Sequence, residues 1–447
     1  MAYASGNDRE YESRDYTHEH PSEEKALKPK DIRSPDFLQE ITIGGSVISY
    51  PIVHKGVCYV GANDKYFYAL SAEDGSELWR FLTGGIILSG ACIYDDILYF
   101  GAADNYVYAL SAKDGKLLWK FKTGNGIVST PMMHKGIVYC GSSDGHLYAL
   151  NKDGGLLWKF RTGGALALCA SISGDRIYFG SFDSHLYSIT TQGDFLWRFR
   201  TGNGIFSSPS ITDKEGNLLW DMFAASPSER IGEASKIFFS SFDGYVYSLS
   251  ANGDFLWRHR SNTMEGTCVV SDKKLYFGGN DGYMRCLSLR GEEHWKKKAG
   301  EIAFGPNVVN GVVYFGSADH NLRALSASSG DLMWMYRAND MITTAPFVEN
   351  DTVYFGSWDG YFSAVKNGEL LWKFRTSLNF SSKIRGMEMA PKLKHVVVKK
   401  YQEKEKSYAT TLSDGSVRIV AYSPATPYKI GTEYAKDIRD RKKEPYR

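Results

Sequence analysis

Residues 137–162 read IVYCGSSDGHLYALNKDGGLLWKFRT, and residues 97–123 read ILYFGAADNYVYALSAKDGKLLWKFKT. The same phrase recurs along the chain, and its tryptophans are spaced by 40, 39, 39, 60, 38, 39 and 38 residues. These tryptophans are Trp79, Trp119, Trp158, Trp197, Trp257, Trp295, Trp334 and Trp372. A nearly constant period of this length indicates a repeat architecture.

Each repeat predicts four short antiparallel strands. Each repeat begins with a short first strand and a turn, followed by a β-branched and aromatic second strand and an Asp turn. An alternating third strand, such as residues 146–150, a glycine turn and the Trp strand complete it. Four such strands in about 40 residues are typical of one propeller blade. We therefore predict an all-β, closed β-propeller over residues 36–433. Each tryptophan is expected to fill the interface between adjacent blades and to donate its indole N–H to a backbone carbonyl of the next blade.

Proline positions identify the strand at the edge of each blade. Five prolines fall in the first strand of their repeats, namely Pro51, Pro131, Pro209, Pro306 and Pro346. Proline lacks an N–H group and is tolerated in sheets mainly on edge strands. The first strand is therefore expected to line the central channel.

The number of blades is left open at eight or nine. Eight repeats carry the full motif, but Ser413–Tyr422 matches the Asp turn and third strand of a ninth, whose Trp strand is replaced by Thr426–Ile430.

At the other end, Phe37–Gly45 resembles the end of a Trp strand. We expect it to be an outer strand that completes the last blade, because such an exchange between the termini removes sheet edges.

Composition and charge exclude several classes of protein. Hydrophobic residues make up 43% of the 447 residues and charged residues 23%, which predicts a globular chain with a large core. The net charge of +2 gives no whole-molecule attraction to nucleic acid or to an anionic membrane. No apolar run is long enough to span a membrane, and Met1–Pro35 has no apolar core of a secretory signal.

The cysteines indicate a reducing compartment. Cys58, Cys92, Cys140, Cys169, Cys268 and Cys286 are far apart and form no CxxC pair. We expect buried free thiols and a cytoplasmic location.

Four segments depart from the repeat. Residues 1–35 are polar and mixed in charge, which predicts a disordered tail. Insertions at residues 213–234 and about 387–406 fall between the first and second strands of their repeats. Residues 434–447 form a basic tail with interspersed acids, for which we expect a solvated segment and only a weak indication of RNA binding.

The phrases ALSAEDGSELW at 69–79 and ALSAKDGKLLW at 109–119 resemble the tryptophan-docking repeat of PQQ-type (quinoprotein-like, BamB-like) β-propellers. The resemblance covers about residues 37–433 and implies a propeller that usually has eight blades. Members of this family include quinone-dependent dehydrogenases and non-enzymatic scaffolds. The resemblance to the alcohol dehydrogenases would imply a vicinal Cys–Cys disulfide, but no two cysteines are adjacent in this chain.

No catalytic, cofactor-binding or metal-binding residue is predicted. An Asp at 64, 104, 144, 183, 243, 281, 319 and 359 repeats in phase, which favours a turn residue that accepts backbone hydrogen bonds. His146, His185 and His320 follow such turns without metal-ligand spacing.

Two groups of residues are candidates for binding a partner. Phe182, Phe242 and Trp358 share the position before the turn Asp, where core packing is the alternative. Leu218, Leu219, Trp220, Met222 and Phe223 form an apolar cluster in the first insertion, which either binds a partner or folds back on the ring.

The sequence therefore predicts a non-enzymatic scaffold for protein partners, built on a PQQ-like propeller. The alternative is a quinone-dependent dehydrogenase or small-molecule binder that uses the channel mouth. PQQ with calcium is expected only under that alternative, since a Ca²⁺ site needs converging oxygen ligands.

Overall fold

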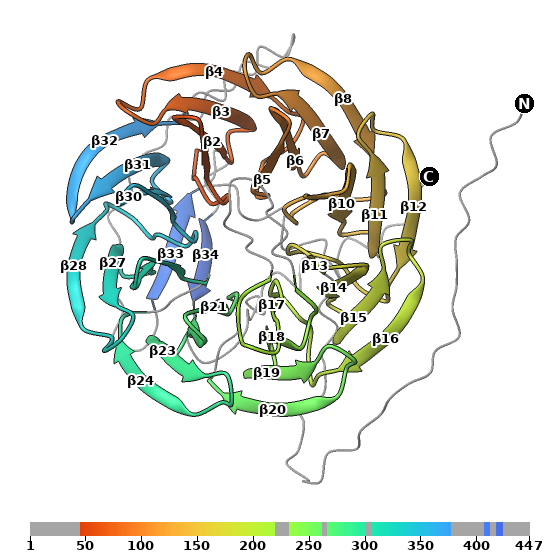
Figure 1. Cartoon of the computed structure of the whole chain (residues 1–447). Helices are drawn as coiled ribbons and strands as arrows, with labels where there is room; N and C mark the ends of the chain where they lie inside the picture. Colours follow the sequence, from red (N-terminus) through yellow and green to blue (C-terminus); the bar gives the residue numbers. More distant parts are fainter. Residues whose placement is uncertain are drawn as a thin grey trace, which may run out of the picture. The chain divides into compact units, whose positions relative to one another are not determined.

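The computed structural model describes residues 45–219, 232–261, 266–300 and 305–376, and the backbone of residues 406–411 and 417–422. Within these ranges the elements are all β-strands, and eight four-stranded antiparallel sheets form a ring (Figure 1). Each sheet is a blade made of four consecutive strands, and the first strand lies nearest the ring axis. The fold is an eight-bladed β-propeller, as predicted, and each first strand forms the inner edge of its blade.

The strand bounds repeat from blade to blade. The innermost strands are β1 (Ile52–His54), β5 (Ala91–Tyr94), β9 (Met132–His134), β13 (Ser171–Ser173), β17 (Ser210–Thr212), β21 (Val269–Ser271), β25 (Asn307–Val309) and β29 (Phe347–Glu349). The second strands are β2 (Val57–Gly61), β6 (Ile97–Gly101), β10 (Ile137–Gly141), β14 (Arg176–Gly180), β18 (Lys236–Ser241), β22 (Lys274–Gly278), β26 (Val312–Gly316) and β30 (Thr352–Gly356).

The outer half of each blade holds the third and fourth strands. The third strands are β3 (Tyr66–Ser71), β7 (Tyr106–Ser111), β11 (His146–Asn151), β15 (His185–Thr190), β19 (Tyr245–Ser250), β23 (Tyr283–Ser288), β27 (Asn321–Ser326) and β31 (Tyr361–Lys366). The fourth strands are β4 (Glu77–Leu82), β8 (Leu117–Lys122), β12 (Leu156–Arg161), β16 (Phe195–Arg200), β20 (Phe255–Arg260), β24 (Glu293–Lys298), β28 (Leu332–Arg337) and β32 (Glu369–Arg375).

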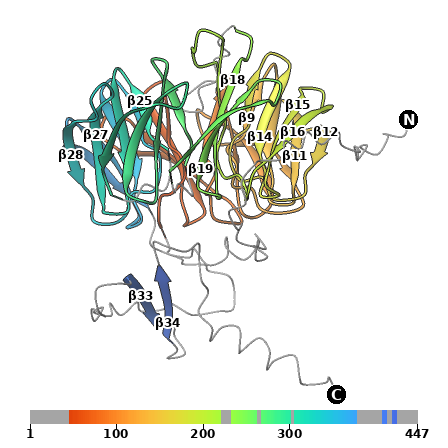
Figure 2. The same ribbon diagram turned by 90° about the horizontal axis from the view of Figure 1, so that it is seen from below.

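Strand direction divides the loops between two faces of the ring. Because neighbouring strands are antiparallel, the chain leaves the second and fourth strands of every blade on the same side. That side, called the connection face, carries the turns between second and third strands and the connections between blades. The strands run between this face and the opposite one, as the side view shows (Figure 2).

The core lies between blades. Second and third strands are buried over most of their length because each is covered by the neighbouring blades, and β10 shows the pattern, with four of its five residues buried. Aromatic rings bridge adjacent sheets: the Phe67 and Phe100 ring centroids, from blades 1 and 2, are 4.2 Å apart and nearly parallel. This packing explains why these strands are apolar on both faces.

Each repeated tryptophan lies at a blade interface, against a glycine of the next blade. An added Cβ at Gly154 in blade 3 would lie 2.8 Å from the ring of Trp119 in blade 2. The Trp119 Nε1 donates to the Lys152 carbonyl at 2.7 Å. The other indole bonds of this kind are Trp79 to Ala112, Trp158 to Thr191, Trp197 to Ala251, Trp257 to Leu289, Trp295 to Ala327 and Trp372 to Ala72.

Trp334 differs because the hairpin that it meets is shorter. Blade 8 joins its third and fourth strands through Asn367 and Gly368, both at positive φ (51° and 84°). The Trp334 side chain lies against Gly368. Among the described residues its indole has no carbonyl partner, because the longer hairpin that supplies one elsewhere is missing.

The ring closes between blade 8 and blade 1 by the same contact. Trp372 Nε1 donates to the Ala72 carbonyl at 3.0 Å, and an added Cβ at Gly75 would lie 2.5 Å from the Trp372 ring. Blade 8 has its own outermost strand, β32. The expected exchange of an outer strand between the termini is therefore wrong for this blade, and residues 37–44 lie outside the described residues.

The nine-blade alternative is also wrong. The ninth repeat contributes β33 (Lys406–Thr411) and β34 (Val417–Tyr422), which pair only with each other in the part of the chain that the structure describes. They belong to a separate compact unit, residues 379–447. The tail at 1–35, the insertion at about 387–406 and residues 434–447 lie outside the described residues, apart from Lys406 itself.

The described residues contain no helix long and apolar enough to cross a membrane.

Two glycine substitutions separate backbone strain from loss of the docking contact. Gly136 and Gly154 have similar φ values, 77° and 82°, but an added Cβ meets nothing within 4 Å at Gly136. We expect Gly136→Ala to cost about 1–2 kcal/mol of unfolding free energy through left-handed strain. Gly154→Ala should cost a further 1–3 kcal/mol or so through overpacking against Trp119. Urea unfolding measures both, and equal losses would contradict the docking role of Gly154.

Candidate functional site

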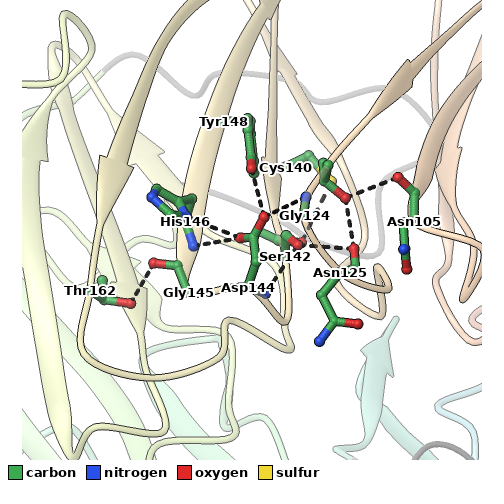
Figure 3. Close-up of polar contacts among 12 residues, drawn as sticks. Asn105, Gly124, Asn125, Cys140, Ser142, Asp144, Gly145, His146, Tyr148 and Thr162 are labelled. Atoms are coloured by element: carbon green, nitrogen blue, oxygen red, sulfur yellow. Dashed lines mark hydrogen bonds and ion pairs between the residues drawn. The ribbon is translucent and has the colours of Figure 1, made fainter. Parts of the chain in front are cut away.

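The turn aspartates on the connection face tie neighbouring blades together. Asp144 Oδ1 accepts the His146 backbone N–H at 2.9 Å, while Oδ2 accepts the Tyr148 hydroxyl at 2.6 Å and the Gly124 N–H at 2.7 Å (Figure 3). Gly124 belongs to the connection that leaves the preceding blade. The predicted turn role is confirmed, and the bond between blades, which sequence reasoning missed, makes these carboxylates structural.

The same set of bonds recurs in other blades. The Asp–Gly pairs are Asp104 with Gly84, Asp183 with Gly163, and Asp243 with Gly202, at 2.7–2.8 Å. Each of these carboxylates also accepts a tyrosine hydroxyl four residues on. Carboxylates with these donors around them have little capacity left to ligate a metal.

Blades 6 and 7 replace that tyrosine by arginine. Arg285 forms a largely buried ion pair with Asp281, and Arg323 pairs with Asp319. Burial alone would raise the pKa of Asp319, but hydrogen bonds from Arg323 and Ser317 and the arginine charge outweigh it and lower the pKa to about 2.

The histidines that follow the turns contact neighbouring groups of the chain. Nδ1 of His146 and Nδ1 of His185 lie 3.2 and 3.3 Å from their turn carboxylates, and His320 Nδ1 lies 3.0 Å from the Asn339 carbonyl oxygen. Among the described residues no three His, Cys, Asp or Glu side chains are grouped as metal ligands are.

All six cysteines are free and buried, as predicted. Burial raises the pKa of Cys92 and of Cys140 to about 12, and that of Cys286 to about 11. Thiols with pKa values this high carry little thiolate and are poor nucleophiles. No two cysteines are adjacent, so the chain lacks the vicinal cysteine disulfide that the resemblance to the alcohol dehydrogenases implies.

Three phenylalanines meet on the connection face of blades 4 and 5. Phe182 precedes turn Asp183, Phe242 precedes turn Asp243, and Phe206 lies in the connection from β16 to β17. Their ring centroids are 5.7–5.8 Å apart in all three pairs, and Phe206 and Phe242 are nearly parallel at 23°. All three are only partly buried. We call this cluster the phenylalanine triad.

Backbone geometry holds the triad together. The Phe242 N–H donates to the Gly204 carbonyl at 2.9 Å, which joins the turn of blade 5 to the connection that carries Phe206. An added Cβ at Gly204 would lie 3.2 Å from the Phe182 ring, so glycine lets that ring approach closely. Three rings already packed on one another lose little conformational freedom when a partner covers them.

The structure brings Phe182 and Phe242 together but not Trp358. Trp358 occupies the same position in blade 8, where its Nε1 donates to Thr343 Oγ1 at 2.7 Å and its carbonyl accepts Ser46 Oγ of blade 1 at 2.8 Å. Sequence reasoning missed Phe206, because the corresponding residues of other blades, such as Leu88 and Val128, are also apolar.

The first insertion begins by folding back on the ring. The Leu219 N–H donates to the Ile211 carbonyl at 2.8 Å, and the Leu219 side chain is 2% exposed in the core between blades 4 and 5. Leu218 is partly buried and packs against the core cluster at the next interface, between blades 5 and 6. For these two residues the structure has the fold-back arrangement. Trp220, Met222 and Phe223 lie outside the described residues.

Comparisons with known proteins agree with this architecture. A family model described as outer membrane protein assembly factor BamB matches residues 82–289 and 242–445. No curated protein sequence matches the chain.

Solved structures with little sequence identity share the fold. The computationally designed Ika8 protein is 16% identical with a TM-score of 0.59, over 74% of this chain and 97% of that one. BamB from Moraxella catarrhalis is 16% identical (TM-score 0.58; 71% and 93%). Quinohemoprotein alcohol dehydrogenase from Comamonas testosteroni is 13% identical (TM-score 0.57; 71% and 71%). Such identities show the fold alone.

The Asp319–Arg323 pair predicts a stability loss in acid. The Asp319 pKa falls from its ordinary 3.8 to about 2 on folding, so its contribution is fully present above about pH 4 and is lost as the pH falls through 2. Urea unfolding between these pH values should therefore show a shallower pH dependence for Asp319→Asn than for the wild type. Parallel curves would contradict the lowered pKa.

Proposed function

We propose that this chain, which belongs to the family described as outer membrane protein assembly factor BamB, is a non-enzymatic scaffold that binds a protein partner on its connection face. The proposed contact is the phenylalanine triad, Phe182, Phe206 and Phe242. A solved structure of BamB shares the fold. The family is described as an assembly factor, and by analogy we extend the binding of a protein partner to this chain.

The triad supports this proposal because the blade fold does not require an aromatic residue at the position of Phe182 and Phe242. At the position of Phe182 and Phe242, other blades have residues such as Ala103, Ser143 and Ala318 and still form the same turn. Three partly exposed rings from two blades are the kind of packed aromatic anchor that dominates protein interfaces.

The repeated polar groups support a scaffold over an enzyme. The turn carboxylates and their tyrosines bond to each other and to the preceding blade, so their recurrence is explained by assembly of the ring. The buried cysteines have raised pKa values and are unsuited to nucleophilic catalysis. Six free thiols also support a reducing compartment, and we propose a cytoplasmic location.

Replacing the triad tests the proposed contact. Phe182→Ser, Phe206→Ser and Phe242→Ser combined should abolish co-purification of the partner from native cells, because the apolar anchor is lost. The matched control is Leu118→Ser and Leu157→Ser, which removes apolar side chains that are 50% and 48% exposed on fourth strands. The control should leave recovery unchanged. Equal recovery with the triad variant would exclude this site.

The enzyme alternative has a direct measurement. The chain is incubated with PQQ and Ca²⁺, separated from free ligand, and examined by absorbance and mass. We expect no retained quinone. Tight stoichiometric binding would overturn the scaffold proposal.

A further inference from the structure

Basic residues end the fourth strands of blades 4 and 5, which carry Phe182 and Phe242, and of blade 6, as they do in most other blades. Arg200, Arg260 and Lys298 are the last residues of β16, β20 and β24, in blades 4, 5 and 6. Two residues earlier, on the same side of each strand, stand Arg198, Arg258 and Lys296. From the docking tryptophan to the end of each of these strands there is no acidic residue.

Strand register places these charges at the connection face. Arg200 pairs with His185 and Arg260 with Tyr245, the first residues of the third strands. Each of those first residues lies three positions after a triad phenylalanine, Phe182 or Phe242. Arg200 and Arg260 therefore lie at the same end of the same blades as Phe182 and Phe242, and Lys298 lies at the corresponding end of blade 6.

Arg200, Arg260 and Lys298 are exposed, and none forms an ion pair with a described residue. The nearby carboxylates of Asp183 and Asp243 are largely buried and already accept bonds from backbone and tyrosine groups. Charged side chains on an outer strand, lysine above all, also protect an open sheet edge from pairing with another chain.

Resting on the proposed function, we infer that the partner segment is acidic: an apolar side chain covers the phenylalanine triad, and Asp or Glu residues beside it meet Arg200, Arg260 and Lys298. Charge of this kind at the rim of an apolar contact speeds association and selects against basic partners. The triad supplies the anchor, and the strand ends supply the preference for acids.

The ring geometry favours a peptide over a single-stranded nucleic acid. Binding of successive bases needs aromatic faces that are open and spaced along the strand. Phe206 and Phe242 instead lie nearly parallel with centroids 5.8 Å apart, and Phe182 contacts both, so these rings cover part of one another. A compact cluster of this kind suits one apolar side chain.

The test uses the full chain and a phage-displayed library of random peptides. Selected peptides are synthesised with a fluorescent label, and their binding is measured at about 50 mM and about 500 mM NaCl, where screening differs strongly. We expect the selected sequences to combine Leu, Phe or Trp with several Asp or Glu. Neutral or basic sequences, or no enrichment, would overturn the inference.

Charge reversal with a matched control tests the named cations. Arg200→Glu, Arg260→Glu and Lys298→Glu combined should weaken binding about tenfold at low salt and much less at high salt. The control reverses Lys122, Arg337 and Arg375, which hold the same strand position in blades 2, 7 and 8, and should change binding less than about twofold. Equal effects of the two variants would contradict the inference.

The triad variant distinguishes the two proposals. If Phe182→Ser, Phe206→Ser and Phe242→Ser abolish peptide binding while charge reversal has no effect, the proposed site stands and the acidic preference is wrong. If the triad variant binds like the wild type, the proposed site itself fails. Binding of a labelled poly-thymidine strand that charge reversal removes would overturn the inference in favour of nucleic acid.

Discussion

The contact between a tryptophan of one blade and a left-handed glycine of the next holds this ring together. The indole ring needs a flat surface without a side chain, and a glycine at positive φ supplies it, as Gly154 does for Trp119. The indole N–H then bonds to a carbonyl of the same hairpin. Because Trp372 meets Gly75 in the same way, the first and last blades join without exchanging a strand.

A second interaction aligns the blades at the connection face. Asp144 holds its own turn and a glycine of the preceding blade, so each blade positions the connection that enters it. Residues at these two repeated interactions are committed to assembly. Function is therefore expected where the repeat is broken, and Phe182, Phe206 and Phe242 break it together in adjacent blades.

The sequence predicts the blades because the spacing of the tryptophans, the alternating pattern of the third strand and the turn residues are all local features of the chain. It does not predict the blade number, since Ser413–Tyr422 has the turn and third strand of a blade but no tryptophan with which to join the ring. Phe182 and Phe242 stand out in the alignment of repeats, whereas Phe206 is recognised only when three rings are placed together. The bond from Asp144 to Gly124 spans two blades and leaves no local signal.

Closure of the ring by tryptophan docking is tested most directly by urea unfolding of Trp372→Ala beside Trp119→Ala. The first removes the docking side chain between blades 8 and 1, and the second removes it between blades 2 and 3. If the ring closes as described, both variants lose a similar free energy of unfolding, about 3–5 kcal/mol. A loss at Trp119 with little or none at Trp372 would contradict closure by this contact.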